Sequence, residues 1–587
     1  MNIGVLGWWS NGNQGDFAIL ESLKRALAPH RVVAIDLPFA INRDKVERLN
    51  LLDFLILGGG GLFQEAPPPP FDTFDLWGRS LRTPLGVAGV GFDAVEAKWR
   101  KAVEALVDQA RFFYVRDEAS REIVGHAKVQ VAPDLSFLYP LFEGAVAPLP
   151  PRNPPLCGVN LRAVPGLDLG RWLEALRALP ARLRGIPLST YATWQEAAIL
   201  RQLDENCAPT FTPALYDGLD LMVGTAFHSI VFAIQAGVPV LAIAYAPKVR
   251  RFMAEVGLVH YTLEPDGWDQ LSLLYARLVA ERESVAEHLR QTSAALTRAA
   301  REAFAAIKEE IETSARPRRW AGPRVSIVVV GSRSEAANRL TLASCLSQTH
   351  ENLEIVLTMN GDRAATEAAS PLPDRVKIVP VRADESVAEQ LNRAFAQATG
   401  EYLSWTVAGN AYTHDAIACL LHRLQQDPAC DAVYADYYTV REDGCILNVH
   451  RVESAAKLFR RNVIGPCFLY RSRLQEKVGP YRAQAPSVAY DYWLRAHRAG
   501  RLQPVHARLL YAQASQDAAQ KQAQEERRTR HLWRSSAPAP TRALWHILDN
   551  DRTERWVIRP LLALLHKAQS AYQRIRLGRG RGSFYEN

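Results

Sequence analysis

The chain has 587 residues, with 70 Lys and Arg against 62 Asp and Glu, a formal net charge of +8, and 48% hydrophobic residues. This length excludes a single hydrophobic core, and the ordinary apolar and charged fractions indicate two or three soluble globular domains. The seven cysteines lack a CxxC pair, which argues against a zinc site and a disulfide framework. No apolar run approaches the roughly 20 residues of a membrane span, and no basic-then-apolar leader precedes the first strand, so we expect a cytoplasmic protein.

The first predicted strand, residues 2–7, leads into the turn GWWSNGNQGD and a helix with the sequence FAILESLKRAL. Asp16 is the expected N-cap of this helix, and Gly15 lets the backbone bend closely. The turn has neither the GxGxxG spacing of a dinucleotide fold nor the final Lys-Ser/Thr of a P-loop. Asn13 and Asp16 instead supply an amide and a carboxylate that suit hydroxyl groups. An equally favoured interpretation is that this segment is a tight strand–helix turn that binds no ligand.

Four consecutive glycines end the third predicted strand. They expose backbone N–H groups without side chains in the way, so Gly59 and Gly60 are candidate ligand contacts. Further strand–turn–helix segments complete an α/β lobe over residues 1–145. Arg116 and Asp117 follow one of its strands, either as a structural ion pair or as ligand groups. The last segment of this lobe contains Asp134, which we expect near the edge of the lobe.

A Pro-rich segment, residues 146–157, links this lobe to a second α/β lobe over residues 155–315. The motif CGVNLR opens the second lobe and places Arg162 at the carboxyl end of a strand. The lobe ends in charged helical segments, for which a solvated helical pair is the default interpretation.

The stretch LMVGTAFHSIVFAIQAGVPVLAIAYAPK, residues 221–248, is the most informative part of the second lobe. It predicts a strand, a turn through Thr225, a helix from Phe227, and a second strand that ends before Lys248. A helix that follows a parallel strand points its N-terminus at the ligand crevice and favours an anion there. His228 lies in the first turn of that helix. An imidazole, a cation and a helix N-terminus together predict a site for a small phosphorylated acid.

A second linker, residues 314–323, precedes a fresh α/β pattern that predicts a separate domain over residues 323–515. The remaining tail, residues 516–587, contains 14 Lys and Arg against 7 Asp and Glu. Apolar residues at helical spacing within residues 553–581 predict a basic amphipathic helix, which suits peripheral contact with the inner face of the membrane. The alternative is a helix packed on the preceding domain. We expect no nucleic-acid partner, because no binding module or aromatic-interleaved basic stripe is present.

The first 315 residues or so resemble the polysaccharide pyruvyl transferase family. The motifs that carry the resemblance occur in the family's order: GNQGDFAIL, GGGGLFQ, VRDEAS, APDLSF, VNLR and FHSIVFAIQAGVPVLAIAYAPK. The resemblance implies a GT-B-like pair of Rossmann-type domains. It also implies phosphoenolpyruvate as the donor, a glycan or lipid-linked sugar as the acceptor, and a pyruvate ketal as the product.

The resemblance assigns roles to individual residues. His228 matches the motif His and is the expected general acid. Arg162 matches the arginine at a strand end, a candidate clamp for carboxylate or phosphate, and Lys248 matches a motif lysine. The family usually has Arg two positions before the motif His, where this chain has Ala226. No metal-ligand set is present, and the chemistry requires no cofactor.

Residues 323–515 resemble an inverting GT-A glycosyltransferase that uses nucleotide sugars, through motifs such as ASCLSQTHENLEIVLTMNG and YDYWLRAHRAG. Residues 407–410, Val-Ala-Gly-Asn, replace the metal-binding Asp-x-Asp run, and Ala489 replaces the catalytic base. We therefore expect a degenerate transferase domain. Three polar residues stay as weaker candidates for contact with a nucleotide sugar: Asn360, Asp436 and Asp491.

The sequence thus predicts an α/β protein with a GT-B-like pair of lobes, a GT-A-like domain and a basic helical tail. The predicted function is transfer of a pyruvyl group to a sugar of a cell-surface glycan. One alternative is a nucleotide-sugar glycosyltransferase that acts through the C-terminal domain. Another is a non-catalytic glycan-binding protein.

Overall fold

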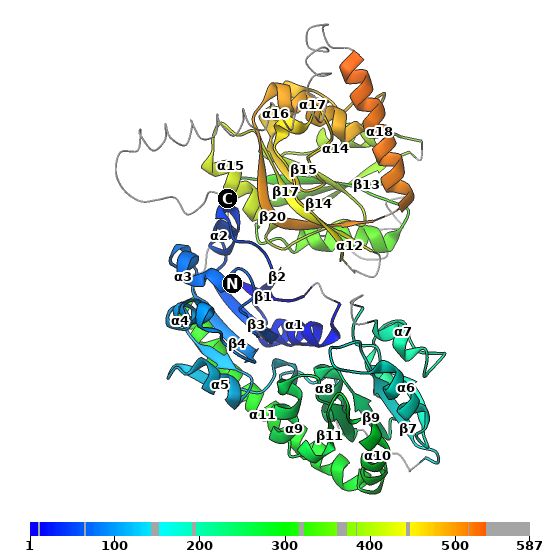
Figure 1. The fold of residues 1–587 in the computed structure, drawn as a ribbon. Coiled ribbons are helices and arrows are strands. Elements are labelled where there is room, and N and C mark those ends of the chain that lie inside the picture. The colour runs from blue at the N-terminus through cyan, green and yellow to red at the C-terminus, as the bar shows by residue number, and fades with distance from the viewer. Residues whose placement is uncertain are drawn as a thin grey trace, which may run out of the picture. The chain divides into compact units, whose positions relative to one another are not determined.

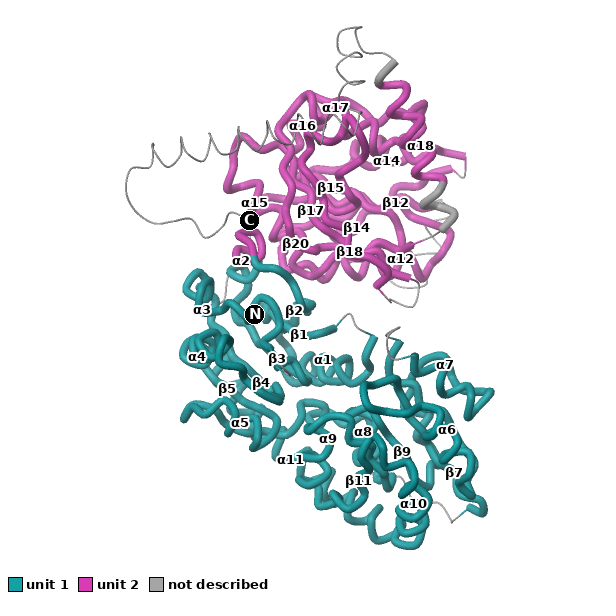
Figure 2. Tube along the Cα trace, viewed as in Figure 1, with its two compact units in different colours: residues 1–41, 48–319 teal, residues 42–47, 320–587 magenta. Residues whose placement is uncertain are grey.

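The computed structural model describes residues 1–9, 12–63, 66–142, 152–190, 195–315, 322–360, 373–382, 384–441, 446–514 and 516–535. The chain divides into two compact units (Figure 2). Unit 1 comprises Met1–Ile41 and Arg48–Arg319, and unit 2 comprises Asn42–Glu47 and Trp320–Asn587.

The first sheet of unit 1 has six parallel strands in the order β2-β1-β3-β4-β5-β6. Their bounds are β1 Asn2–Gly7, β2 Arg31–Asp36, β3 Phe54–Phe63, β4 Leu85–Phe92, β5 Phe113–Val115 and β6 Val129–Val131. The helices that follow these strands in the sequence include α1 Gln14–Ala26, α2 Arg43–Leu49, α3 Phe74–Trp77, α4 Arg100–Gln109 and α5 Glu118–Val124. Most of α2, up to Glu47, belongs to unit 2. The central strands read as continuous apolar runs because both faces of a parallel sheet are covered.

The second sheet of unit 1 has five parallel strands in the order β11-β10-β9-β7-β8. Their bounds are β7 Leu156–Asn160, β8 Arg182–Gly185, β9 Leu221–Gly224, β10 Val240–Ile243 and β11 Thr262–Leu263. The accompanying helices are α6 Leu169–Arg177, α7 Glu196–Leu200, α8 Phe227–Gln235, α9 Pro247–Glu255, α10 Leu271–Ala280 and α11 Arg282–Ser314. The predicted strand–turn–helix–strand of residues 221–248 is therefore present as β9, α8 and β10.

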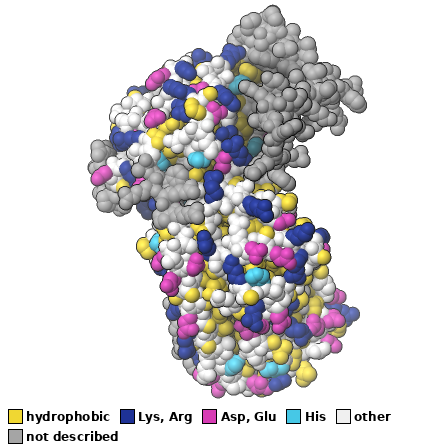
Figure 3. Space-filling view, turned by 90° about the vertical axis from the view of Figure 1, so that its left-hand side faces the viewer, with side chains coloured by type: hydrophobic (Ala, Val, Ile, Leu, Met, Phe, Trp, Pro, Cys, Tyr) yellow, Lys and Arg dark blue, Asp and Glu magenta, His cyan; other side chains and the backbone are white. Residues whose placement is uncertain are grey.

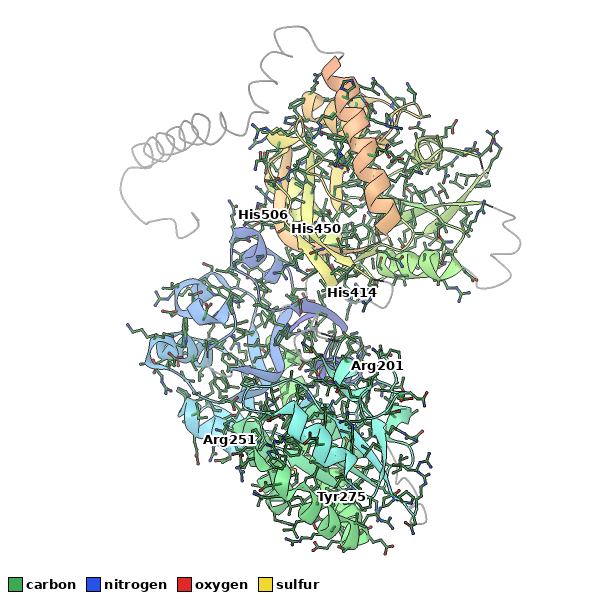
Figure 4. The ribbon with its side chains drawn as sticks, turned by 45° about the vertical axis from the view of Figure 1, so that its right-hand side comes forward. Arg201, Arg251, Tyr275, His414, His450 and His506 are labelled. Atoms are coloured by element: carbon green, nitrogen blue, oxygen red, sulfur yellow. The ribbon has the colours of Figure 1, made fainter. Side chains whose placement is uncertain are left out.

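The two sheets of unit 1 pack together through one continuous apolar core. Helices α1 and α8 lie next to each other at this junction (Figure 1). The long helix α11 reaches back to the first sheet, where Nζ of Lys308 donates to the carbonyl of Ala28 at 3.0 Å. Arg251, labelled in Figure 4, adds an ion pair across the sheets, with Nη1 3.6 Å from Oδ1 of Asp93. Side chains from both sheets can therefore contribute to one site.

Unit 2 contains a mixed sheet in the order β14-β13-β12-β15-β19-β17-β20-β16, with β18 paired to β17. Its strands are β12 Val325–Val330, β13 Leu353–Asn360, β14 Val376–Val381, β15 Tyr402–Val407, β16 Ala411–Tyr412, β17 Ala432–Val440, β18 Ile446–His450, β19 Phe468–Arg471 and β20 Leu502–Gln513. Its helices include α12 Glu335–Leu346, α14 Val387–Phe395, α15 Ala416–Gln426, α16 Ser472–Val478, α17 Val488–Ala499 and α18 Gln516–Ser535. The first four strands are parallel, β19 is antiparallel to both of its neighbours, and β17 and β20 pair in parallel.

Helix α18 forms the start of the basic tail and packs on α17. The backbone N–H of Ser487 donates to Oγ1 of Thr529 at 2.8 Å, and Nε1 of Trp533 donates to Oδ1 of Asp491 at 3.0 Å. The predicted amphipathic segment, residues 553–581, lies outside the described residues. Within the part that the structure describes, every helix is too short or too polar to cross a bilayer. Lys and Arg are interspersed with Asp and Glu on the molecular face shown in Figure 3.

Candidate active site at the junction of the two parallel sheets

The turn after β1 holds the N-terminus of α1 against the second sheet. Asn13 is the N-cap, because its Oδ1 accepts from the N–H of Gly15 at 3.2 Å. The expectation that Asp16 is the cap was wrong: it lies in the first turn, where its Oδ2 accepts from Nδ2 of Asn13 at 3.0 Å. Asn13 also forms an isolated antiparallel bridge with Ser189, which follows β8 of the second sheet. The predicted amide and carboxylate therefore face the junction of the sheets.

The predicted glycines of β3 permit close packing of α1. Gly59 and Gly60 have φ values of +90° and +79°, which L side chains rarely adopt. A Cβ on Gly59 would lie 2.4 Å from Cγ2 of Ile19, and one on Gly60 would lie 2.9 Å from Oδ1 of Asp16. These glycines bring Asp16 close to the backbone of the strand. Their contact with a ligand stays a prediction.

His228 is the second residue of α8 and is only 6% exposed. One side of its ring packs on Gly15, since a Cβ there would lie 1.9 Å from Nδ1. The other ring nitrogen, Nε2, lies 3.7 Å from Oδ1 of Asp134. This distance is within the range of an ion pair but is longer than a hydrogen bond. The predicted imidazole therefore lies between the two sheets, in contact with residues of both.

Asp134 follows β6 and is 4% exposed. Its Oδ1 accepts from the N–H of Ser136 at 3.0 Å and caps a short 3₁₀ helix. Burial raises the pKa of this carboxyl, but His228, Arg116 and the Ser136 N–H outweigh burial and lower the pKa to about 2. The carboxylate is therefore ionised throughout the physiological pH range.

Two buried cations line a narrow pocket beside this pair. The pocket is partly open to solvent, and its lining includes Arg116, Asp134, Phe227 and Lys248. The Arg116 guanidinium lies 4.7 Å from the centre of the Phe227 ring, a cation–π contact from the first sheet to the second. Lys248 is the second residue of α9, and the described residues contain no ion pair to its ammonium. Its Nζ lies 5.5 Å from the ring centre of Tyr245.

Two further carboxylates line the pocket. Asp117 caps α5, because its Oδ1 accepts from the N–H and the hydroxyl of Ser120. It also lies 3.5 Å from Nε of Arg116, so the pair predicted as structural or ligand-binding is an ion pair. Desolvation, followed by the charge of Asp117, raises the pKa of Glu255 to about 7. Because the Glu255 side chain is exposed to solvent, water screens these effects, and we assign it no proton transfer.

The candidate clamp Arg162 is held by a buried carboxylate. Its Nη2 lies 2.5 Å from Oε1 of Glu196, whose Oε2 accepts from the N–H groups of Leu188 and Ser189. Arg162 therefore stands at the end of β7 outside the pocket lining. Thr225 is fully buried in the turn before α8, and its hydroxyl has no hydrogen-bond partner among the described residues.

Sequence reasoning underestimated Arg116 and Asp134. Both follow strands of the first sheet, in the motifs VRDEAS and APDLSF. The carboxyl ends of parallel strands meet at one edge, so these motifs could have been placed together. Their contacts to α8 cross more than 90 residues and required the three-dimensional structure.

In unit 2, the turn 407–410 stands where the resembling glycosyltransferases have their metal-binding Asp-x-Asp run, and it contains no carboxylate. Asn410 is used structurally: its Oδ1 accepts from the N–H of Gln513 at 3.3 Å, and its carbonyl accepts from Thr341 at 2.7 Å. Gly409 adopts a φ of +98°, and its N–H donates to the Thr341 hydroxyl. The described residues contain no group of three His, Cys, Asp or Glu that could hold a metal.

The weaker candidates in unit 2 are separated in the fold. Asp491 braces two helices, with Oδ2 accepting from Nε of Arg495 at 2.9 Å and Oδ1 from Trp533. Asp436 in β17 accepts from the N–H of Val452 at 2.8 Å, and Nδ1 of His506, labelled in Figure 4, lies 3.4 Å from it. Asn360 ends β13, and its side chain lies outside the described residues. Contact of any of the three with a nucleotide sugar stays a prediction.

Two segments of the chain match known protein-family models. The family model described as polysaccharide pyruvyl transferase matches residues 13–192, and the model described as glycosyl transferase family 2 matches residues 326–477. These two matches agree with the fusion predicted from the sequence. An uncharacterized glycosyltransferase of Rickettsia felis is 24% identical over 199 residues, which cover 31% of this chain and 32% of that protein. The chain thus spans about a third of the length of the curated relatives it matches.

Solved glycosyltransferase structures are distant. S. aureus TarS 1–349 in complex with UDP-GlcNAc has a TM-score of 0.28 and 14% identity, covering 33% of this chain and 59% of that chain. The mannosyltransferase PcManGT from Pyrobaculum calidifontis has a TM-score of 0.31 and 18% identity, covering 44% of this chain and 83% of that chain. These values are too low to carry residue roles between the proteins.

Proposed function

We propose that unit 1 transfers a pyruvyl group from phosphoenolpyruvate to a sugar of a cell-surface glycan. One observation carries the proposal: two buried cations, Arg116 and Lys248, line a single pocket whose wall includes Asp134, the partner of His228. Phosphoenolpyruvate bears a carboxylate and a phosphate, so its site requires cations that are held in place. The match of residues 13–192 to the pyruvyl transferase family supports the same donor.

Arg116 supplies the guanidinium that the sequence lacks at position 226. Ala226 is buried, and its N–H donates to Oδ1 of Asn160 at 2.9 Å, so the backbone before α8 is fixed without an arginine. Arg116 approaches from the first sheet and lies over Phe227, the next residue of the chain. A cation is thereby provided beside His228 from a different strand. This placement supports the interpretation that unit 1 is catalytically active, against the interpretation that Ala226 weakens its activity.

The proposed reaction begins with protonation of the methylene carbon of the donor, which creates an oxocarbenium-like centre at the adjacent carbon. An acceptor hydroxyl then attacks that centre and loses its proton, the bond from carbon to the phosphate oxygen breaks, and a second hydroxyl adds and loses its proton to close the ketal. One hydroxyl proton restores the proton donor and the other leaves with the phosphate. His228 supplies the first proton, a contribution of roughly 10²–10⁴-fold in rate. Arg116 and Lys248 hold the anionic groups, and Asn13 and Asp16 contact acceptor hydroxyls at the adjoining end of α1. None of these roles requires a metal or a resident cofactor.

Unit 2 positions the glycan acceptor in this proposal. Its family match supports a sugar-binding fold, whereas Val407 and Asn410 stand where carboxylates would bind a metal–diphosphate. The acceptor is a glycan or a lipid-linked sugar on the cytoplasmic side of the membrane. The alternative, a nucleotide-sugar glycosyltransferase acting through unit 2, has support from the family match and from the similarity to curated glycosyltransferases. A purely glycan-binding protein would leave the buried cations of unit 1 unexplained.

The test is incubation of the full-length chain with phosphoenolpyruvate and a panel of glycan acceptors, with phosphate release and acceptor mass as readouts. We expect phosphate release that depends on one acceptor class, together with a pyruvyl mass increase on that acceptor. His228→Ala should abolish both signals, while Arg171→Gln on the surface of unit 1 should retain them. Equal phosphate release by His228→Ala would refute the assigned proton donor.

A further inference from the structure

We propose that the exposed face of helix α18 is a docking surface for an anionic lipid membrane. We call this surface the α18 basic face, and its residues are Lys521, Gln524, Arg527, Arg528, His531 and Leu532. The inference goes beyond the proposed function and does not depend on pyruvyl transfer. It concerns described residues of unit 2, which precede the segment 553–581 in the chain.

The first argument is that α18 has one packed face and one exposed face. Thr529 is buried, and its hydroxyl accepts from the N–H of Ser487 at 2.8 Å. Glu526 and Trp533, one turn before and one turn after Thr529, also hold the helix on unit 2 through hydrogen bonds. The residues of the α18 basic face recur at the same helical spacing on the opposite side. Because the helix lies along the outside of unit 2 (Figure 1), its packing leaves that side exposed.

The second argument is the charge of this face. Arg527 and Arg528 are exposed, and neither forms an ion pair within the part of the chain that the structure describes. The acidic residues of the same stretch, Glu525 and Glu526, are only partly exposed. The α18 basic face itself contains no acidic residue. Exposed cations of this kind attract an anionic surface, and each contributes separately to binding at a membrane.

The third argument is the apolar side chain at the end of the face. Leu532 is 56% exposed, one turn after Arg528. At the next residue, Trp533, the guanidinium carbon of exposed Arg498 lies 4.6 Å from the ring centre and adds a cation there. A leucine among arginines suits a lipid surface, because the leucine enters the acyl boundary while the guanidinium groups contact headgroup phosphates. Leucine gives no stacking contact to a nucleic-acid base, so the membrane is the favoured partner.

The position of the face in the chain supports the same partner. The described residues end at Ser535, just after Leu532, and residues 536–552 lead to the basic segment 553–581. The sequence predicts membrane contact for that segment as well. Two neighbouring segments that bind one surface reinforce each other, because the first contact raises the effective concentration of the second.

The test is co-sedimentation of the full-length chain with phosphatidylcholine vesicles that contain or lack phosphatidylglycerol. The test variant combines Arg527→Gln, Arg528→Gln and Leu532→Gln, since glutamine is a good helix former. We expect the unaltered chain to bind the phosphatidylglycerol vesicles and the test variant to bind them about tenfold or more weakly. Arg527→Lys combined with Arg528→Lys keeps the charge and should keep the binding.

The matched control combines Arg201→Gln, Arg298→Gln and Leu273→Gln, which replace three exposed side chains of unit 1. This control should bind as the unaltered chain does, and circular dichroism should show that both triple variants are folded. Binding of the unaltered chain should weaken as NaCl is added.

Three results would overturn the proposal. The first is equal binding of the unaltered chain and the test variant, and the second is equal binding to vesicles with and without phosphatidylglycerol. The third is binding of a single-stranded RNA that the test variant loses while its vesicle binding is unchanged, which would assign the face to a nucleic acid. A chain that binds vesicles through this face and releases no phosphate from phosphoenolpyruvate would support the docking surface and refute the pyruvyl transfer.

Discussion

The guanidinium carbon of Arg116 lies 4.7 Å from the centre of the Phe227 ring, and this contact joins the first parallel sheet of unit 1 to the helix that carries His228. The two residues are 111 positions apart in the sequence. Their contact places a buried cation next to the imidazole although the chain has alanine at position 226. Several consequences of this arrangement are measurable.

Replacement of Gly91 with alanine should displace the Arg116 guanidinium. A Cβ at this position of β4 would lie 2.5 Å from Nε and Nη2 of Arg116. The guanidinium is the end of a flexible side chain, so we expect it to move while the fold persists. KM for phosphoenolpyruvate should rise about tenfold, the equivalent of ~1.4 kcal/mol. Gly267→Ala, whose nearest neighbour would lie 3.6 Å away, is the control and should leave KM unchanged.

Replacement of Gly15 with alanine should disturb both stability and activity. The new methyl would lie 1.9 Å from Nδ1 of His228, a ring that the surrounding aromatic side chains prevent from moving away. Overpacking of this kind costs about 1–3 kcal/mol of the free energy of unfolding. Thermal unfolding and phosphate release report the two effects. Gly170→Ala in α6, with its nearest contact at 3.4 Å, should be neutral or stabilising, and an equal loss in both variants would contradict the proposed packing.

Unit 2 should not bind a nucleotide sugar in a Mn²⁺-dependent manner. The turn 407–410 has no carboxylate. The side-chain and backbone oxygens of Asn410 accept hydrogen bonds from Gln513 and Thr341. A sugar diphosphate needs a divalent cation to offset its charge at such a site. Calorimetric titration of UDP-sugars and GDP-sugars with and without Mn²⁺ provides the measurement. Binding that appears only with the metal would favour the glycosyltransferase alternative.

Acid should destabilise unit 2 through Glu354. Burial raises the pKa of this carboxyl, but Lys377 at 2.5 Å, Ser326 and the N–H of Thr399 outweigh burial and lower the pKa to about 2. Because the pKa is lower in the folded chain, the stabilisation is complete above the unfolded value near 4.5 and is lost as pH falls toward 2. The loss amounts to about 3 kcal/mol.

Hydrogen exchange in β12 and β13, followed from pH 6 downward, measures this effect. Glu354→Gln should be less stable than the unaltered chain at pH 6 and should lose less stability on acidification. Glu335→Gln, which removes an exposed ion pair with Arg339, is the matched control and should change little. A pH dependence that is identical in the Glu354→Gln variant and the unaltered chain would contradict the role of Glu354.

Local sequence signals identified the elements that hold the candidate site. The turn before α8, the imidazole in its first turn and the lysine after β10 all follow from strand–helix periodicity and glycine positions within a short stretch. The glycines of β3 were recognised for the same reason. Each of these features depends on neighbours within a few residues.

The partners of those residues could not be predicted, because they come from distant strands. The sequence predicted that Arg162 binds a carboxylate or phosphate of the ligand. In the structure its Nη2 forms an ion pair with Oε1 of Glu196 in α7, at 2.5 Å. Asp134 gave no sign of its pairing with His228, which joins the two sheets. The cap of α1 was assigned to Asp16 because aspartate and asparagine are both strong caps, and only the backbone decides between Asn13 and Asp16.

The central claim is that an anionic three-carbon donor binds at the pocket lined by Arg116 and Lys248. The most direct test is calorimetric titration of phosphoenolpyruvate into the unaltered chain, Arg116→Gln, Lys248→Met and the surface control Arg171→Gln. The account predicts binding to the unaltered chain and to Arg171→Gln, and affinity about tenfold or more weaker in each of the other two variants. Equal affinity in all four proteins, or no binding to the unaltered chain, would contradict it.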